Sequence, residues 1–176
     1  MADESHKRDA AGGEGELVKV TVKGLILDPA SNDPIVILRE EGGERFLPIW
    51  IGIFEANAIA LRLEGVNTPR PLSHDLMASI IEGMNSRLER IVVCDLKDST
   101  FFAQLVLRAD GRETVIDARP SDAIALALRT QATIFVEADV FDKAQQVELS
   151  NRITDEEKIK KWLEEVDPED LGKYTM

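Results

Sequence analysis

One apolar segment occurs twice in the sequence, and this repeat is the feature that most limits the folds open to the chain. Residues 58–63 are AIALRL and residues 123–128 are AIALAL, at an offset of 65 positions. Each segment follows a predicted strand and a short turn, and its alanines allow a helix to pack closely against a sheet. The sequence therefore predicts an internally duplicated unit of three strands and one helix.

Alternating apolar and polar residues predict the first strand, and segments bounded by turns predict the others. Pro48 indicates that the third strand lies at a sheet edge or begins late. We predict an α+β fold around a mixed or antiparallel sheet, with a C-terminal helical extension. The predicted strands are residues 17–27, 35–40, 45–52, 89–98, 99–110, 112–118 and 132–138. The predicted helices are residues 54–65, 72–88, 120–130 and 155–171.

The domain boundaries follow from composition. Residues 1–16 are polar and lack the apolar segment of a secretory signal, so we expect a disordered tail. Residues 17–137 form the duplicated domain, and residues 138–176 form the helical extension. No apolar run is long enough to cross a membrane. Cys94 is the single cysteine, which excludes an internal disulfide and fits a cytoplasmic protein.

The charge balance limits the partners of the chain. The net charge of the chain is −12. Residues 17–137 carry 17 acidic and 13 basic residues, so most of the excess negative charge lies in the two terminal segments. A protein that coats nucleic acid electrostatically carries a basic surface instead. Any contact with nucleic acid is therefore expected to be local, through a metal ion or a few arginines.

Charged residues gather where the second repeat passes from strand to helix. In IDARPSDAIALALRT, residues 116–130, the polar residues at the joint between strand and helix are Asp117, Arg119, Ser121 and Asp122. The corresponding positions of the first unit are mostly apolar, and a helix cap alone does not need that difference. The second unit is therefore specialised for a site or for a subunit interface.

A second loop has the same make-up. The segment RPLSHDL supplies Arg70, His74 and Asp75, again with Arg-Pro ahead of a helix and an acid in its first turn; Ser73 is the expected N-cap. One interpretation is structural, with the acids offsetting the helix dipole and pairing with the arginines. The other is functional, with the arginines binding phosphate and the carboxylates and histidine holding a divalent metal. A shared site requires the two helix N-termini to converge.

Several blocks of the sequence, in the same order, resemble the signature blocks of the bifunctional nuclease family. They are FLPIWIGIFEANAIAL, RPLSHDL, FFAQLVL, IDARPSDAIALAL and the closing KKWLEEVDPEDL. The resemblance implies an α+β domain with a duplicated core, usually an oligomer, and nuclease activity on DNA and RNA. Its motif positions here are His74, Asp75, Asp117, Arg119, Ser121 and Asp122.

The resulting hypothesis is a nuclease that hydrolyses phosphodiester bonds with Mg²⁺ or Mn²⁺. Asp117 and Asp122, with Asp75 or Glu55, would hold the metal. His74 would act as general base or acid, because its ordinary pKa lies near neutrality. The substrate would be bound by the guanidinium groups of Arg70 and Arg119 and by the hydroxyl of Ser121.

An alternative is a non-catalytic oligomeric module that binds a protein partner or a small anionic ligand. The acidic balance and the missing basic groove favour this alternative. The helices around Ile59 and Ile124 are apolar nearly all round, and the helix over 155–171 has a narrow apolar stripe. We therefore predict a homo-oligomer, most simply a two-fold dimer.

Overall fold

The computed structural model describes residues 15–150. The predicted helix over 155–171 and nearly all of the predicted N-terminal tail lie outside the described residues. The helices are α1 (Ile53–Leu63), α2 (Ser73–Gly83), α3 (Pro120–Thr130) and α4 (Ala138–Ser150). The strands are β1 (Leu17–Leu27), β2 (Pro34–Glu40), β3 (Phe46–Trp50), β4 (Arg87–Lys97), β5 (Thr100–Ala109), β6 (Arg112–Ala118) and β7 (Thr133–Glu137).

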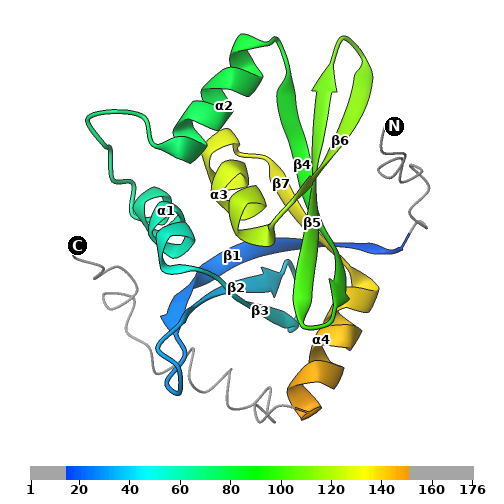
Figure 1. Ribbon diagram of the computed structural model, residues 1–176. Coiled ribbons are helices and arrows are strands. Elements are labelled where there is room, and N and C mark those ends of the chain that lie inside the picture. The colour runs from blue at the N-terminus through cyan, green and yellow to red at the C-terminus, as the bar shows by residue number, and fades with distance from the viewer. Residues whose placement is uncertain (1–14, 151–176) are drawn as a thin grey trace, which may run out of the picture.

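The seven described strands form one mixed sheet in the order β3-β2-β1-β7-β4-β5-β6. Only β4 and β7 pair in parallel among them, and every other neighbouring pair is antiparallel. This arrangement confirms the α+β fold (Figure 1). The order of three strands and a helix occurs twice, with β7 between the two sets of strands. A common origin of the two units stays a prediction.

Local sequence explains the edges and turns of the sheet. Pro48 cannot donate a ladder hydrogen bond, and β3 lies at an edge, which is the first of the two arrangements that its proline predicts. The hairpin between β5 and β6 turns at Asp110 and Gly111, both with positive φ (49° and 75°). Such left-handed pairs match the twist of the flanking strands, so they favour tight hairpins.

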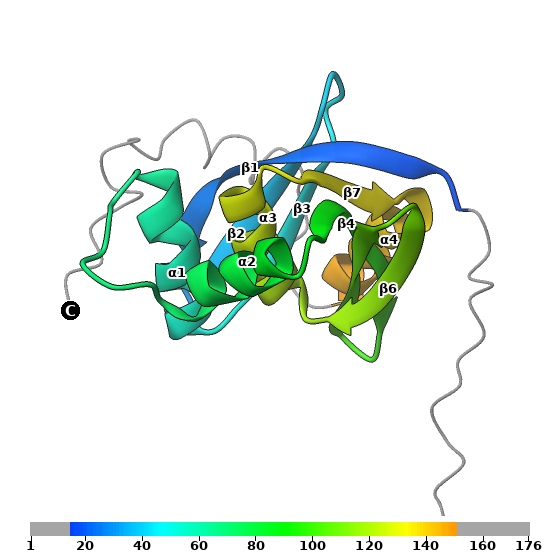
Figure 2. The ribbon, with the colours of Figure 1, turned by 90° about the horizontal axis from the view of Figure 1, so that it is seen from above.

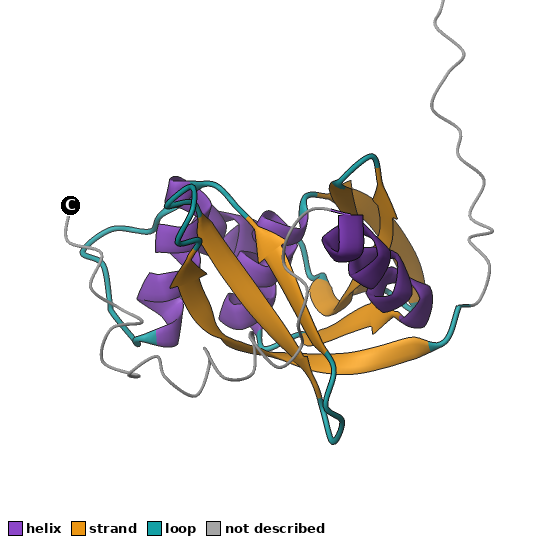
Figure 3. Cartoon of the chain, turned by 90° about the horizontal axis from the view of Figure 1, so that it is seen from below, coloured by secondary structure: helices purple, strands orange, loops and turns teal. Residues whose placement is uncertain are grey.

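The helices occupy two places around the sheet. Figures 1 and 2 show α1, α2 and α3 together, and Figure 3 shows α4 apart from them, with strands between. Helix α4 buries Val140, Phe141 and Ala144 in the main core. The guanidinium of Arg45 lies 4.6 Å from the centroid of the Phe141 ring, so α4 closes the core beside the turn between β2 and β3.

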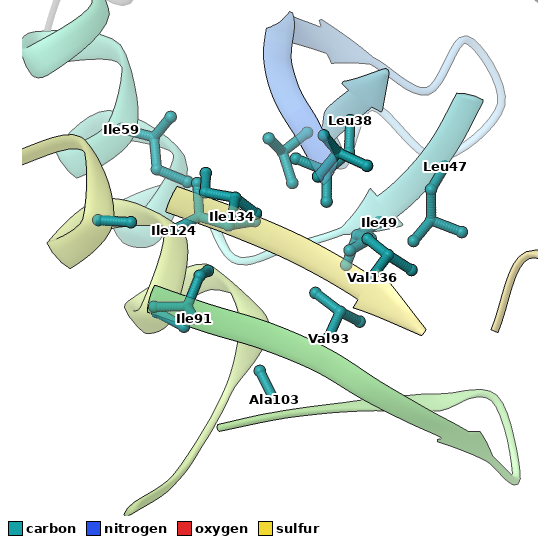
Figure 4. Packing of buried hydrophobic residues seen from close by; sticks show 14 of the residues in the cluster. Leu38, Leu47, Ile49, Ile59, Ile91, Val93, Ala103, Ile124, Ile134 and Val136 are labelled. Carbon is teal, nitrogen blue, oxygen red and sulfur yellow. The ribbon is translucent and has the colours of Figure 1, made fainter. Parts of the chain in front are cut away.

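Helix α3 is the centre of the core. Residues 123–127 are all buried, and Figure 4 shows Ile124 among Ile59, Ile91 and Ile134. Ile59 and Ile124 are both fully buried within the single chain. A second subunit is not needed to cover these two side chains, but α1 leaves Ile53, Phe54 and Leu63 exposed at 49%, 84% and 42%. The oligomer itself stays a prediction.

Helix α2 differs from its prediction at both ends. Its N-cap is Leu72 and not Ser73, because the Asp75 carboxylate accepts the hydrogen bond from the Leu72 amide at 2.9 Å. The helix ends at Gly83, and Asn85 follows with a positive φ of 53°. The helix residues Leu76 and Ile80 are 54% and 50% exposed, and Met84 at the C-cap is 70% exposed.

Candidate functional site

The N-terminal turns of α2 and α3 meet, as a shared site requires. His74 Nε2 lies 3.0 Å from Asp122 Oδ1, across 48 positions of sequence. His74 is only 8% exposed, and it is the one buried residue of α2. The helix therefore turns its histidine inward while most of its apolar side chains stay in solvent.

A third helix joins this contact through Arg119. Arg119 Nε donates to Asp122 Oδ2 at 2.7 Å, and its Nη1 lies 3.0 Å from Glu55 Oε1. Arg119 is the N-cap of α3, and Glu55 lies in the first turn of α1. The Arg119 side chain is 65% exposed. We call these four residues, Glu55, His74, Arg119 and Asp122, the junction cluster.

The junction cluster favours an ionised Asp122. Burial by itself raises the pKa of this carboxyl group, but the hydrogen bonds from Arg119 and His74 outweigh burial and lower the pKa below its usual value. An ionised carboxylate only accepts hydrogen bonds, so Nε2 of His74 carries the proton that points to it. The remaining nitrogen of a neutral His74, Nδ1, then holds a free lone pair.

His74 Nδ1 reaches the surface although the residue as a whole is buried. It makes no hydrogen bond within residues 15–150. No fully buried side-chain nitrogen or oxygen of that region lacks a partner, so Nδ1 must touch solvent. The same reasoning applies to the hydroxyl of Ser121, a buried residue of the first turn of α3. These two polar atoms of the N-terminal turns of α2 and α3 therefore keep some contact with solvent.

Asp75, a predicted catalytic residue, belongs to a different set of contacts. Arg129 Nε donates to Asp75 Oδ1 at 2.6 Å, and the guanidinium also donates to the carbonyls of Ala58 and Ala125. The Arg129 side chain is only 7% exposed. This arginine therefore fastens α1 and α2 to α3, and Asp75 serves as its counter-ion.

Sequence reasoning missed Arg129. Its only signal is a basic residue in the last turn of an otherwise apolar helix, a position that also suits the helix dipole. Dipole compensation explains such a residue fully, so nothing local to the sequence points to its bonds with two other helices.

Asp117 lies away from the junction cluster. It sits in β6 opposite Gln104 of β5 and is exposed. Its neighbour Ala118 packs against the core that contains α3. Successive side chains of a strand point to opposite faces, so Asp117 points away from α3 and Asp122.

Arg70, a predicted substrate ligand, is exposed in the loop before α2. Its carbonyl accepts a hydrogen bond from the Thr68 hydroxyl at 2.8 Å. Its guanidinium makes no hydrogen bond or ion pair within the described residues, so no contact ties it to the cluster.

The predicted metal ligands Asp117, Asp122 and Glu55 are not gathered around one point. Glu55 and Asp122 both bind Arg119, whose guanidinium lies where a cation would have to sit. Residues 15–150 contain no group of three or more histidine, cysteine or acidic side chains suited to hold a metal. The residues present do not fit the predicted metal, and no step is derived through it.

The sheet and the junction cluster define the class of protein. It is an α+β domain in which charged side chains connect the N-terminal turns of three helices. The chain belongs to the bifunctional nuclease domain family, whose model matches residues 36–148. Within residues 15–150, no helix has the length and apolarity needed to cross a membrane.

Individual relatives lie in bacteria and plants. An uncharacterized protein of Mycobacterium tuberculosis is 38% identical over 162 residues, which cover 87% of this chain and 97% of the relative. Bifunctional nuclease 1 of Oryza sativa is 27% identical over 62% of this chain and 34% of its own length. Bifunctional nuclease 1 of Arabidopsis thaliana is 28% identical over 64% of this chain and 36% of its own length.

Proposed function

We propose that this protein is a nuclease that hydrolyses phosphodiester bonds of DNA or RNA at the junction cluster. The hydrogen bond between His74 and Asp122 carries the proposal, because it holds a histidine with one nitrogen open to solvent beside an exposed arginine. The plant relatives, which are named bifunctional nucleases, support nucleic acid as the substrate.

His74 acts as the general base in this proposal. Asp122 holds the Nε2 proton and stabilises the imidazolium that forms when Nδ1 accepts a proton from water. The water oxygen then attacks phosphorus, and the bond between phosphorus and the leaving oxygen breaks. The imidazolium afterwards returns the proton to the leaving oxygen.

Arg119 supplies the charge for the phosphate. A guanidinium binds two phosphate oxygens in a fork and stabilises the negative charge that develops during hydrolysis. Glu55 and Asp122 already neutralise this guanidinium, so a phosphate has to displace Glu55. The exposed Arg119 side chain allows that exchange, and the competition predicts weak binding of single phosphates.

The test compares purified wild-type protein with His74→Ala and Asp122→Asn on single-stranded and duplex DNA and on RNA. Loss of a general base lowers the rate by about a hundredfold or more. His6→Ala and Asp110→Asn are matched controls, because His6 lies outside the described residues and Asp110 lies in the hairpin turn between β5 and β6. Equal cleavage by wild type and both cluster variants means that a contaminating nuclease is at work, and the proposal fails.

Dependence on Mg²⁺ or Mn²⁺ stays a prediction. Treatment with EDTA, followed by return of either ion, measures it in the same assay. Cleavage at full rate in EDTA would show that the reaction needs no metal ion. Loss of cleavage in EDTA and its recovery with either ion would show that residues other than the predicted ligands bind the metal. The single cysteine, Cys94, supports a cytoplasmic location as a further part of the proposal.

A non-catalytic docking module is the second candidate, and one observation favours it. The apolar side chains of α2 at Leu76, Ile80 and Met84 are half exposed or more, as is typical of surfaces that contact other proteins. This candidate predicts no cleavage by the pure wild-type protein under any metal condition.

A further inference from the structure

The second strand of the sheet is apolar on both of its faces. The first five residues of β2, from Pro34 to Leu38, have the sequence PIVIL, and all of them are buried. A strand with one face in water alternates apolar and polar residues, whereas a continuous apolar run is typical of a strand that is covered on both faces. We therefore expect β2 to have packing partners on both sides of the sheet.

The described helices cover only one of these two faces. Val36 and Leu38 belong to the main core, together with the buried apolar residues of α1, α3 and α4. Successive side chains of a strand point to opposite faces, so Ile35 and Ile37 lie on the other face. There they belong to a separate apolar cluster, which we call the outer cluster and which consists of Ile26, Ile35, Ile37 and Phe46. Figures 2 and 3 show from opposite sides that α1, α2 and α3 all lie on one side of β1 and β2.

The outer cluster is nevertheless closed to water. Ile26, Ile35 and Ile37 are only 7%, 4% and 1% exposed. Side chains on a bare sheet face keep more contact with water than this, so these values are typical of a face that lies under a second layer. No residue of the described helices belongs to the outer cluster, which leaves the two terminal segments of the chain as the source of that layer.

Of the two terminal segments, only the C-terminal one has a suitable apolar pattern. Residues 1–14 contain no apolar side chain larger than alanine apart from Met1. The predicted helix over 155–171 carries apolar residues three, four and seven positions after the first, a spacing that places them on one side of a helix. They are Ile159, Trp162, Leu163 and Val166.

Helix α4 brings the chain to the edge of the sheet beside the outer cluster. It contacts β3, and the ring of its Phe141 lies 4.6 Å below the guanidinium of Arg45, the residue before Phe46. β3 is an edge strand, so a chain that leaves α4 at Ser150 can pass round that edge without crossing the sheet. The four residues 151–154 span up to about 14 Å when extended, which is more than the distance of about 5 Å between neighbouring strands.

Charge also favours the C-terminal segment. Arg39 follows Ile37 on the same face of β2, is exposed and makes no ion pair within residues 15–150. Residues 155–171 include eight acidic and three basic residues. An acidic side chain beside the apolar stripe can therefore pair with Arg39 when the stripe packs on the outer cluster.

We propose that the helix over 155–171 docks on the outer cluster of its own chain and forms the second layer over β1, β2 and β3. Its apolar stripe then packs against the three isoleucines and Phe46. The stripe is covered within each chain in this arrangement, so by itself it gives no reason for a second subunit.

Trp162 reports this docking by its fluorescence, because the emission of an indole moves to shorter wavelength when the ring leaves water. The full chain with Trp50→Phe has Trp162 as its only tryptophan. We expect its emission to lie at shorter wavelength in buffer than in urea. Phe46→Asp on the sheet and Leu163→Asp on the stripe should each remove most of that shift, whereas the control Ile80→Asp on the exposed side of α2 should leave it unchanged. Circular dichroism checks that each variant is folded.

Photo-crosslinking locates the helix without adding a charge to the sheet. With p-benzoylphenylalanine in place of Phe46, irradiation of the full chain should join this position to a peptide within 155–171, in a product with the mass of one chain. The same group in place of Ile80 is the control and should not capture that peptide.

Two fluorescence results would overturn the proposal. One is equal emission of Trp162 in buffer and in urea. The other is a shift that Leu163→Asp removes and a folded Phe46→Asp variant retains, because the stripe then docks elsewhere. A crosslinked product with the mass of two chains would assign the outer cluster to a second copy, and the absence of any crosslink to 155–171 would leave the helix away from β2; both results also overturn the proposal.

Discussion

At the scale of single residues, Arg129 shows how one side chain holds several elements. Its buried guanidinium is bonded to a carboxylate of α2 and to carbonyls of α1 and α3. Arg129 is only 7% exposed and Asp75 is 34% exposed, so removing the arginine leaves two carbonyls without a donor and a half-buried carboxylate without its counter-ion. The cluster of bonds around Arg129 is therefore a stability element, next to but separate from His74 and Asp122.

We expect Arg129→Ala to lower the free energy of unfolding by about 2 kcal/mol or more, because two carbonyls and the half-buried Asp75 carboxylate lose their partner. Urea unfolding measures this loss. Arg108→Ala is the matched control: Arg108 pairs with Glu89 at 2.8 Å but is 36% exposed, so its loss should cost about 1 kcal/mol or less. Equal effects from the two variants would contradict the fastening role of Arg129.

At the scale of elements, α2 and α3 show opposite relations between sequence and burial. Both are 11 residues long and rich in apolar residues. α3 is enclosed by the sheet, α1 and α2, whereas α2 lies on the outside of that layer and buries only His74. Position in the layer, and not apolar content, decides which helix contributes to the core.

This difference predicts unequal effects of the same kind of substitution. Ile124→Ala in α3 should lower the free energy of unfolding by about 2–5 kcal/mol, because it leaves a cavity in a closed core. Ile80→Ala in α2 should change it by less than about 1 kcal/mol, because the side chain is already 50% exposed. A large loss for Ile80→Ala would show that its apolar surface is covered in solution.

At the scale of the whole molecule, an ion pair joins α4 to the sheet. Lys143 of α4 donates to Asp95 of β4 at 2.8 Å, and Lys97 also pairs with Asp95 at 2.6 Å. The hydrogen bonds from these two lysines lower the pKa of Asp95 from 3.8 to about 2. The acid stability of the contact between α4 and the sheet therefore depends on Asp95.

A lowered pKa in the folded state means that the stabilisation is complete above the unfolded pKa and is lost as the pH falls toward about 2. We expect Asp95→Asn to lower the free energy of unfolding by about 1 kcal/mol near neutral pH, after allowance for solvent screening. The difference from wild type should shrink at about pH 3. Urea unfolding at both pH values tests this, with Asp110→Asn as the control, and a difference independent of pH would contradict it.

Local patterns alone determined much of the architecture. The apolar run after Arg119 predicted α3 over residues 120–130, and these are its observed bounds. Pro48 predicted a strand that lies at an edge or begins late, and β3 lies at an edge. Alternation over the first strand, and segments bounded by turns elsewhere, predicted all seven described strands to within a few positions. These features depend on neighbours in the sequence, because backbone propensity and side-chain period act over a few residues.

The tertiary structure decided which charged residues meet. His74 and Asp122 are 48 positions apart and come within 3.0 Å, because α2 and α3 bring their N-termini together. Asp117 is only five positions from Asp122, yet strand alternation turns it to the other face of the sheet. Distance along the chain does not determine distance in space. The sequence could therefore identify the charged residues as candidates, but only the packing of the helices on the sheet determined which of them are in contact.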